Sequence, residues 1–351
     1  LEKVGARLWI FRIMFTWGLV SMAMAFAQGP WSFYGLRFLL GVAEAGFFPG
    51  MMLYLTYWFP QSQRAKYNSL FFAAIPLSSA LGSPLSGYIL GFDGFQGLHG
   101  WQWLFLLEGL PSCVLAFAVL FVLPDKPARA KFLTDAEKQF VATTLAREAT
   151  PPASLWAGLS DRRVWILAVT DIGIIIALYG LGLWLPQIVK AMGFSNLETG
   201  FVVALPYVAS TIAMILWARS SDTLRERVWH VAIPALFASA SLIAAGFLGA
   251  NLWAILALTG ASIGIYAALV TYWTLPPSFL GGTAAAGGIA FINSVGNLGG
   301  FFGPTLMGWL KQSTGGYAAG MFVLAGFLIV PAVVVVVLGR TRALALAPAH
   351  R

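Results

Sequence analysis

Two oppositely charged residues, Arg37 and Glu44, lie within one long apolar stretch of the sequence. They are seven positions apart, so a helix would place them on one face, about 10 Å apart along its axis. Inside a membrane each charge costs roughly 2.5–3.5 kcal/mol on insertion scales, and both must therefore face a partner or a wet cavity. The pair indicates either an ion pair that joins two helices or a site for an anion and a proton on a transport path.

The overall composition predicts a membrane protein. Hydrophobic residues make up 59% of the chain and charged residues only 10%, against about 25% charged in soluble domains. The net charge of +8 does not indicate a nucleic-acid partner, because the basic residues lie in loops between apolar runs. The predicted surroundings are the lipid bilayer of the inner (plasma) membrane.

The sequence offers no recognisable catalytic apparatus. Its single cysteine, Cys113, and its three scattered histidines form no metal-binding cluster. It contains no nucleophile beside a base, no paired catalytic carboxylates and no phosphate-binding loop. We therefore expect neither an enzyme nor a bound metal or other cofactor.

Ten apolar runs approach or exceed the roughly 20 residues that a spanning helix requires, which predicts an all-α integral membrane fold. The polar segment 124–162 separates a block of four runs from a block of six. Within it, Thr134 and Glu137 form a capping-box pattern, so we expect a short helix that ends near Arg147. The ten runs are 9–27, 33–58, 67–90, 103–123, 163–186, 199–218, 229–249, 252–275, 284–310 and 318–338.

Basic residues in the loops predict the orientation. If the ten runs alternate across the membrane, one side holds only Lys190 and Lys311. The positive-inside rule makes the other, richer side cytoplasmic, and both visible termini lie there. The predicted domains are an N-terminal bundle, a cytoplasmic linker with a short amphipathic helix, a C-terminal bundle and a cytoplasmic tail, at 1–123, 124–162, 163–339 and 340–351.

The two halves of the chain repeat each other, as duplicated transporters do. An acidic residue, basic residues and a tryptophan recur in register at 2–9 and at 222–229. Pro84 and Pro304 follow glycines at nearly matching places, where we expect breaks in the helices. If the charged loop follows the second helix of each half, the chain lacks the first two of twelve helices.

At these residues the chain resembles the major facilitator superfamily, and within it the anion:cation symporter family of tartrate, phthalate, hydroxyphenylacetate and sugar-acid permeases. The loop EKVGAR at 2–7 resembles the superfamily signature between helices two and three. Further matches are RFLLGVAEAGFFPG at 37–50, GWQWLFLLEGLP at 100–111, LYGLGLWLPQIVK at 178–190 and INSVGNLGGFFGP at 292–304.

The resemblance implies two helical bundles with pseudo-two-fold symmetry that rock about a central site. In such relatives the R-x6-E pattern of helix four serves substrate and proton coupling, which assigns these roles to Arg37 and Glu44. It assigns substrate binding to Asn293 as well, with Tyr179 as a further candidate. Asp171, which the family does not lead us to expect, is a second candidate for proton coupling. The alternative for Asp171 and Asn293 is a hydrogen bond to a neighbouring helix.

The predicted function is proton-coupled symport of a small organic carboxylate into the cell by a monomer. The apolar run around Ile75 lacks the polar amide of sugar-acid permeases, which favours a less hydroxylated or an aromatic acid. The alternatives are an exchanger of organic acids or phosphate esters and, outside transport, a membrane sensor or scaffold. A cytoplasmic charge network that latches the closed state is expected from Glu2, Arg7, Asp222 and Arg227.

Overall fold

The computed structural model describes residues 4–147, 155–280 and 282–340, and within these ranges every regular element is a helix. The chain divides into two compact units. Unit 1 consists of Leu1–Asn68 and Ser86–Ala149, and unit 2 of Ser69–Leu85 and Thr150–Arg351.

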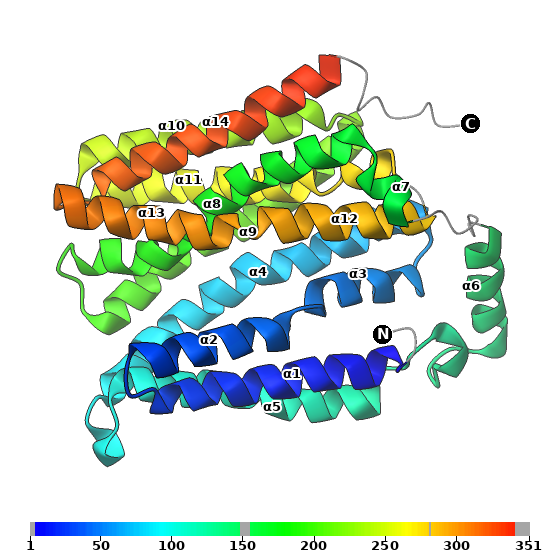
Figure 1. Cartoon of the computed structure of the whole chain (residues 1–351), viewed down its shortest axis with the longest axis horizontal. Coiled ribbons are helices and arrows are strands. Elements are labelled where there is room, and N and C mark those ends of the chain that lie inside the picture. Colours follow the sequence, from blue (N-terminus) through cyan, green and yellow to red (C-terminus); the bar gives the residue numbers. More distant parts are fainter. Residues whose placement is uncertain (1–3, 148–154, 281, 341–351) are drawn as a thin grey trace. The chain divides into compact units, whose positions relative to one another are not determined.

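The core of unit 1 is a pair of long helices, α1 (Ala6–Ala23) and α5 (Gly100–Val122), which lie side by side (Figure 1). Glycine makes this close packing possible, because a Cβ on Gly18 would lie only 2.9 Å from the backbone carbonyl of Gly109. The Ser112 hydroxyl also donates to the carbonyl of Met14 at 3.1 Å. Small residues and polar contacts therefore join the two helices where lipid gives no hydrophobic drive.

The second predicted span of unit 1 is not one helix. It forms α2 (Pro30–Glu44) and α3 (Phe47–Thr56), which are separated at Ala45 and Gly46. Ala45 is extended, with φ −54° and ψ 127°, and Gly46 adopts φ 91°, in the region that favours glycine. A proline at position 49 has no N–H to bond the carbonyl of Ala45, so a continuous helix would lose a hydrogen bond here.

The rest of unit 1 consists of a helix shared with unit 2 and short connecting elements. The shared helix, α4 (Gln61–Ile89), continues through Pro84 without a break. The linker helix α6 (Asp135–Arg147) begins at the predicted capping box, where Glu137 Oε2 accepts from the Thr134 N–H and hydroxyl, each at 2.8 Å. The short elements are η1 (Met24–Phe26), η2 (Leu90–Phe92), η3 (Phe95–Gly97) and η4 (Pro127–Arg129).

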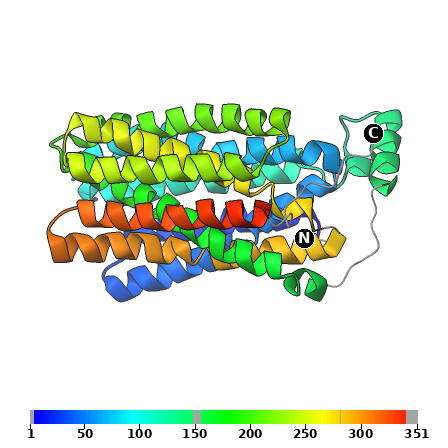
Figure 2. The ribbon, with the colours of Figure 1, turned by 90° about the horizontal axis from the view of Figure 1, so that it is seen from above.

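Unit 2 is built around a long central helix, α8 (Arg162–Lys190), which packs against α12, α13 and α14. Figures 1 and 2 show α12 and α13 running end to end, with α10 beside α14. The other helices are α7 (Leu155–Leu159), α9 (Asn196–Leu224), α10 (Val228–Leu248), α11 (Leu252–Tyr272), η5 (Pro276–Ser278), α12 (Gly282–Gly296), α13 (Gly299–Thr314) and α14 (Ala318–Arg340).

Side-chain caps begin three of these helices. Asp161 accepts from the Arg163 N–H at 2.8 Å at the start of α8, and Asn251 accepts from the Ala254 N–H at 3.0 Å at the start of α11. Ser195 and Glu198 form a capping box at the start of α9. Each cap satisfies backbone donors that the helix leaves unpaired, which fixes where the helix begins.

The expected count of ten continuous spans is not confirmed. Eight helices in the described part of the chain are long and apolar enough to cross a membrane. The runs 33–58 and 284–310 each form two shorter helices instead, divided at Gly46 and at Asn297–Leu298. The breaks expected at Pro84 and Pro304 are not seen, because both prolines lie inside continuous helices.

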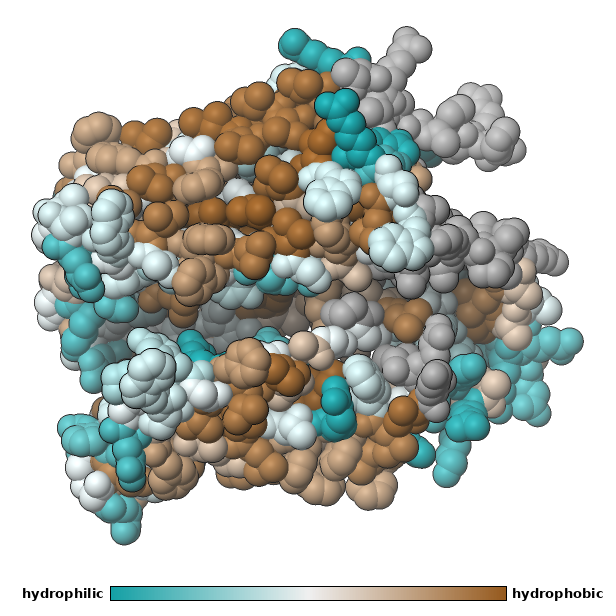
Figure 3. Space-filling model, in the orientation of Figure 1, coloured by the Kyte–Doolittle hydropathy of each residue, from teal (hydrophilic) through white to brown (hydrophobic). Residues whose placement is uncertain are grey.

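The surface agrees with a membrane protein. Hydrophobic side chains cover the visible flanks of the helices in each unit, and hydrophilic residues gather near the helix ends (Figure 3). On α14, for example, the exposed side chains include Ile329, Val330, Val333 and Val337.

The capping box of α6 yields a test that depends on pH. Hydrogen bonds from the Thr134 N–H and hydroxyl hold the pKa of Glu137 below its usual value of 4.5. Because the folded pKa is lowered, the carboxylate stabilises α6 above pH 4.5 and loses this effect as the pH falls through its folded pKa. We expect amide protection factors in the first turn of α6, from hydrogen exchange, to fall over that acid range.

Glu137→Gln supplies the control, since its amide oxygen still accepts hydrogen bonds but does not titrate. Its α6 protection factors should be lower at neutral pH and nearly independent of pH. An equally steep acid transition in this variant would assign the effect to another group.

Candidate functional site

In unit 1 the two charged residues of the second apolar run lie on α2, as the spacing predicts. Arg37 and Glu44 are both exposed, and Glu44 is the last residue of the helix, directly before the break at Gly46. No ion pair joins these two described side chains, although they interact electrostatically. The Arg37 guanidinium lies 5.7 Å from the centre of the Phe33 ring. In this conformation the two charges are therefore not a static ion pair with each other.

In unit 2 three of the predicted residues lie along the contact of α8 with the α12–α13 junction. Tyr179 of α8 is 43% exposed. Its ring covers Gly300 of α13, where a Cβ would lie 3.3 Å away. Asn293, half-buried on the last turn of α12, accepts a hydrogen bond from the Asn297 amide at 3.0 Å. This bond joins residues on either side of the helix end, so it is local and not the interhelical bond considered as the alternative.

Asp171 is the most unusual of the predicted residues. It is 1% exposed, and neither carboxylate oxygen has a hydrogen-bond partner among the described residues. The carboxyl group packs directly on Gly296, the last residue of α12, where a side chain would overlap it. The alternative of a hydrogen bond to a neighbouring helix is therefore wrong for the described residues. A buried carboxyl without a partner is costly as an anion, which marks it as a group that gains from a proton.

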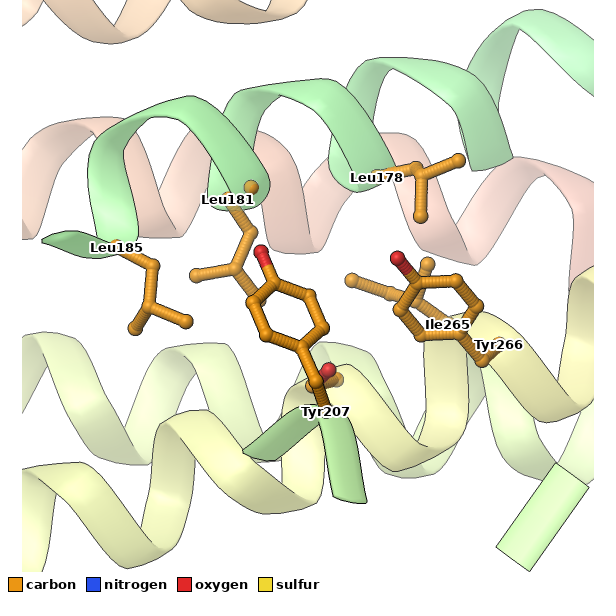
Figure 4. Close-up of a pocket in the computed structure, with 8 residues that line it drawn as sticks. Leu178, Leu181, Leu185, Tyr207, Ile265 and Tyr266 are labelled. Atoms are coloured by element: carbon orange, nitrogen blue, oxygen red, sulfur yellow. The ribbon is translucent and has the colours of Figure 1, made fainter. Parts of the chain in front are cut away.

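A small pocket lies between α8, α9 and α11 (Figure 4). It encloses about 10 Å³ and is lined by aliphatic side chains of α8 and by Tyr207, Ser262 and Tyr266. The rings of Tyr207 and Tyr266 meet edge to face, with centres 6.3 Å apart. Tyr179 is within electrostatic range of Tyr266. Sequence analysis did not single out Tyr207 or Tyr266, because a lone tyrosine in an apolar run has no spacing that distinguishes it from packing residues.

Of the four residues predicted to form a charge network, Asp222 and Arg227 pair with each other, whereas Arg7 contacts residues outside the predicted set. Arg227 forms an ion pair with Asp222 at 2.5 Å and donates to Ser221 Oγ at 2.9 Å. The Arg7 backbone N–H donates to Asp125 Oδ1 at 3.0 Å, and its guanidinium donates to the carbonyl of Leu120 at 3.3 Å. Glu2 lies outside the described residues.

Sequence analysis missed three polar side chains that these loops use. Asp125 caps the N-terminus of α1, which a search for an acid just beyond the linker boundary could have found. Glu226 accepts from the N–H groups of Trp229 and His230 and lies 2.8 Å from His230 Nδ1. Partial burial raises the pKa of Glu226, but these hydrogen bonds lower it by more. The net effect is a pKa below its usual value. His230 follows Glu226 by four residues, a helical spacing that could have indicated the pair.

Residues 1–304 match the Major Facilitator Superfamily. The chain is 50% identical, over 97% of its length and 80% of the relative's, to a putative tartrate transporter of Agrobacterium vitis. It is also 42% identical, over 93% of its length and 76% of the relative's, to a quinolone resistance transporter of Acinetobacter baumannii.

Among solved structures, the fold is similar to a bacterial homologue of the human lysosomal transporter Spinster, in an inward-facing and occupied conformation. The TM-score is 0.69 at 16% identity, and the match covers 95% of this chain and 82% of that one. A match at this identity concerns the fold alone.

The contact between Asp171 and Gly296 predicts a specific coupling. Gly296→Ala places a methyl group in space that the Asp171 carboxyl occupies, which should destabilise the protein by about 1–3 kcal/mol. A thermal-unfolding series in detergent, comparing the wild type with Gly296→Ala, Asp171→Ala and the double variant, measures this. We expect the second substitution to restore part of the stability that Gly296→Ala removes. Strictly additive losses would show that the two residues do not share this space.

Proposed function

Because the chain belongs to the Major Facilitator Superfamily, a family of membrane transporters and not of enzymes, we propose that it is a proton-coupled symporter. In this proposal it carries a small organic carboxylate into the cell by alternating access, as a monomer in the plasma membrane. The proposed domains are those predicted from the sequence, with helical bundles at 1–123 and 163–339 and the linker at 124–162. Both visible termini are proposed to lie in the cytoplasm.

Relatives and residue chemistry together support a carboxylate as substrate. A relative that is 50% identical is named a putative tartrate transporter. The exposed guanidinium of Arg37 suits a carboxylate, because it offers planar donors for two parallel charge-assisted hydrogen bonds. Asn293 and Tyr179 are proposed as further substrate ligands. Tartrate-like, aromatic and sugar acids all fit this chemistry.

Glu44 is the proposed site of proton coupling. It ends α2, where the negative end of the helix dipole opposes a carboxylate, while Arg37 attracts it. Protonation of Glu44 would remove that attraction and leave Arg37 to bind the substrate carboxylate. Release of the substrate and the proton would restore the starting state. The observation that carries this proposal is that Arg37 and Glu44 lie on the same helix, α2. They attract each other electrostatically but do not form an ion pair.

A second proton site is proposed at Asp171. Its carboxyl has no hydrogen-bond partner among the described residues and packs against the end of α12. Loss of its proton would place an anion against the α12–α13 junction, so protonation there would change the preferred packing of the two helices. Asp171 would then act by position and not by touching the substrate.

Proton coupling also answers an electrostatic requirement. A membrane potential of 100 mV, negative inside, opposes the entry of one negative charge by about 2.3 kcal/mol. One proton per monovalent anion cancels this cost, and any further proton lets the potential favour uptake.

The loops are proposed to act as cytoplasmic latches. One latch would be the ion pair of Asp222 and Arg227. Another would consist of Glu2 and Arg7, whose backbone N–H is held by Asp125. Together they would stabilise one state of the transport cycle. Exposed ion pairs contribute at most about 1 kcal/mol each, so several must act together. Such weak contacts suit a gate that opens in every cycle.

The test of the proposed function is uptake of labelled tartrate into proteoliposomes. With an inward proton gradient, the wild type should accumulate the acid, whereas Glu44→Gln should lose accumulation but keep exchange of internal for external substrate. Arg37→Lys should raise KM at least tenfold, because it removes the bidentate donors. Glu108→Gln is the matched control, since Glu108 is an exposed carboxylate of α5 that accepts from Ser86 within unit 1.

The same assay separates the alternatives. An exchanger would take up substrate only when the proteoliposomes are loaded with an organic acid or a phosphate ester. Its uptake rate would not depend on the proton gradient. A quinolone is tested in the same uptake assay, because one relative is named a quinolone resistance transporter. Full accumulation by Glu44→Gln would remove Glu44 from the coupling mechanism.

Asp171→Asn tests the second proton site. The amide has the shape of the protonated carboxyl but carries no titrating proton, so we expect transport to persist with a flatter pH dependence. Measuring initial uptake rates against pH for the wild type and the variant checks this. An unchanged pH profile with unchanged activity would make Asp171 a packing residue.

A further inference from the structure

The pocket between α8, α9 and α11 contains two phenol groups in an otherwise apolar setting. Tyr207 is 8% and Tyr266 is 5% exposed. In the described part of the chain, no hydrogen bond of either hydroxyl to another residue is seen, and neither oxygen is among the fully buried polar atoms that lack a partner. Figure 4 shows both rings rising towards α8, with their hydroxyls on that side, beneath Leu178 and Leu181.

The surroundings leave these hydroxyls without a partner of their own. Leu178, Leu181, Leu185 and Ile265 line the pocket and offer no polar side-chain atom. Ser262 also lines it, and its hydroxyl is held by Ser210 of α9 at 2.8 Å. Both hydroxyls face the pocket without a protein partner, so an oxygen atom that enters the pocket can form hydrogen bonds with them.

The pocket has room for that atom. Gly182 of α8 lies on its wall, where a Cβ would reach only ordinary van der Waals contact with the Tyr207 hydroxyl, at 3.6 Å. The enclosed volume of about 10 Å³ is close to that of a single water or hydroxyl. The pocket therefore accepts one oxygen-bearing group and not a whole acid.

We propose that Tyr207 and Tyr266 form a subsite that recognises a hydroxyl group of the transported acid. This inference rests on the proposed function and adds a basis for its substrate selectivity. A hydroxyl both donates and accepts, which matches two phenols that can each do either. An acid without that hydroxyl would leave both phenols unpaired, so the subsite favours hydroxy acids over otherwise equal ones.

The subsite also changes the expectation drawn from α4. The apolar surroundings of Ile75 favour a less hydroxylated or an aromatic acid, if hydroxyl recognition depends on an amide in that helix. Tyrosines of α9 and α11 supply the missing donors from other helices. The proposal therefore restores a hydroxylated dicarboxylate as the substrate class.

The test compares tartrate with succinate, a dicarboxylate with the same carbon chain and no hydroxyl. Equilibrium binding of each to the purified intact protein gives a ratio of dissociation constants that does not depend on proton coupling. Tyr207→Phe and Tyr266→Phe each remove one oxygen and keep the ring. We expect each variant to weaken tartrate binding about tenfold, the loss of one hydrogen bond, and to leave succinate binding unchanged.

Tyr272→Phe is the matched control. Tyr272 is a fully buried tyrosine of the same helix as Tyr266, and its hydroxyl donates to the carbonyl of Leu167 at 2.6 Å. This variant should lower thermal stability without changing the tartrate-to-succinate ratio. The comparison separates loss of a ligand contact from loss of a structural hydrogen bond.

The outcomes distinguish the subsite from the proposed function. A ratio that stays constant in both Tyr207→Phe and Tyr266→Phe, or that changes equally in Tyr272→Phe, overturns the subsite. Equal weakening of both acids shows a structural water only and also overturns it. Proton-driven accumulation by the wild type decides the proposed function separately, and absence of tartrate binding by the wild type overturns the subsite without excluding another carboxylate as the substrate.

Discussion

The cost of an unpaired polar group in apolar surroundings is the constraint on which this structure depends. Backbone groups avoid the cost by forming helices, and helix ends avoid it through caps such as Asp161 and Asn251. Against this background, the groups that do not avoid it are informative. The Asp171 carboxyl makes no hydrogen bond within the described residues, and the phenols of Tyr207 and Tyr266 face a small pocket without a protein partner. Each is therefore a place that we propose for a proton or for an oxygen atom of a ligand.

Close packing is a second constraint on the structure, because it decides where such groups can lie. Gly296 allows the Asp171 carboxyl to lie against α12, because a methyl group there would occupy the space of the carboxyl. Gly182 lines the pocket beside the Tyr207 hydroxyl, where a methyl group would only reach van der Waals contact. Glycine in this chain therefore creates room for polar chemistry inside helices as well as close approach between them.

The sequence predicted the helical class, the linker helix and the positions of most spans, because apolar length and the Thr134–Glu137 pattern depend only on neighbouring residues. It placed the helix breaks wrongly. Pro84 and Pro304 lie within continuous helices, while the chain breaks at Gly46 and Asn297–Leu298. A proline loses one hydrogen bond, and a helix can continue past that loss when its neighbours support it, so the outcome depends on tertiary packing. The tyrosine pocket was beyond sequence analysis for the same reason, since three helices far apart in the chain form it.

Charge and hydroxyl recognition need different physics, which explains why they would use different residues. In the proposed mechanism a carboxylate is bound by a permanent cation, Arg37, and that attraction is coupled to the charge of Glu44 and hence to the proton. A hydroxyl carries no net charge, so its proposed recognition by Tyr207 and Tyr266 would not alter the charge balance of the cycle. Substitution of the tyrosines would therefore change which acid is preferred while the number of protons per acid stays the same. Selectivity and energy coupling would then be separable properties of one transporter.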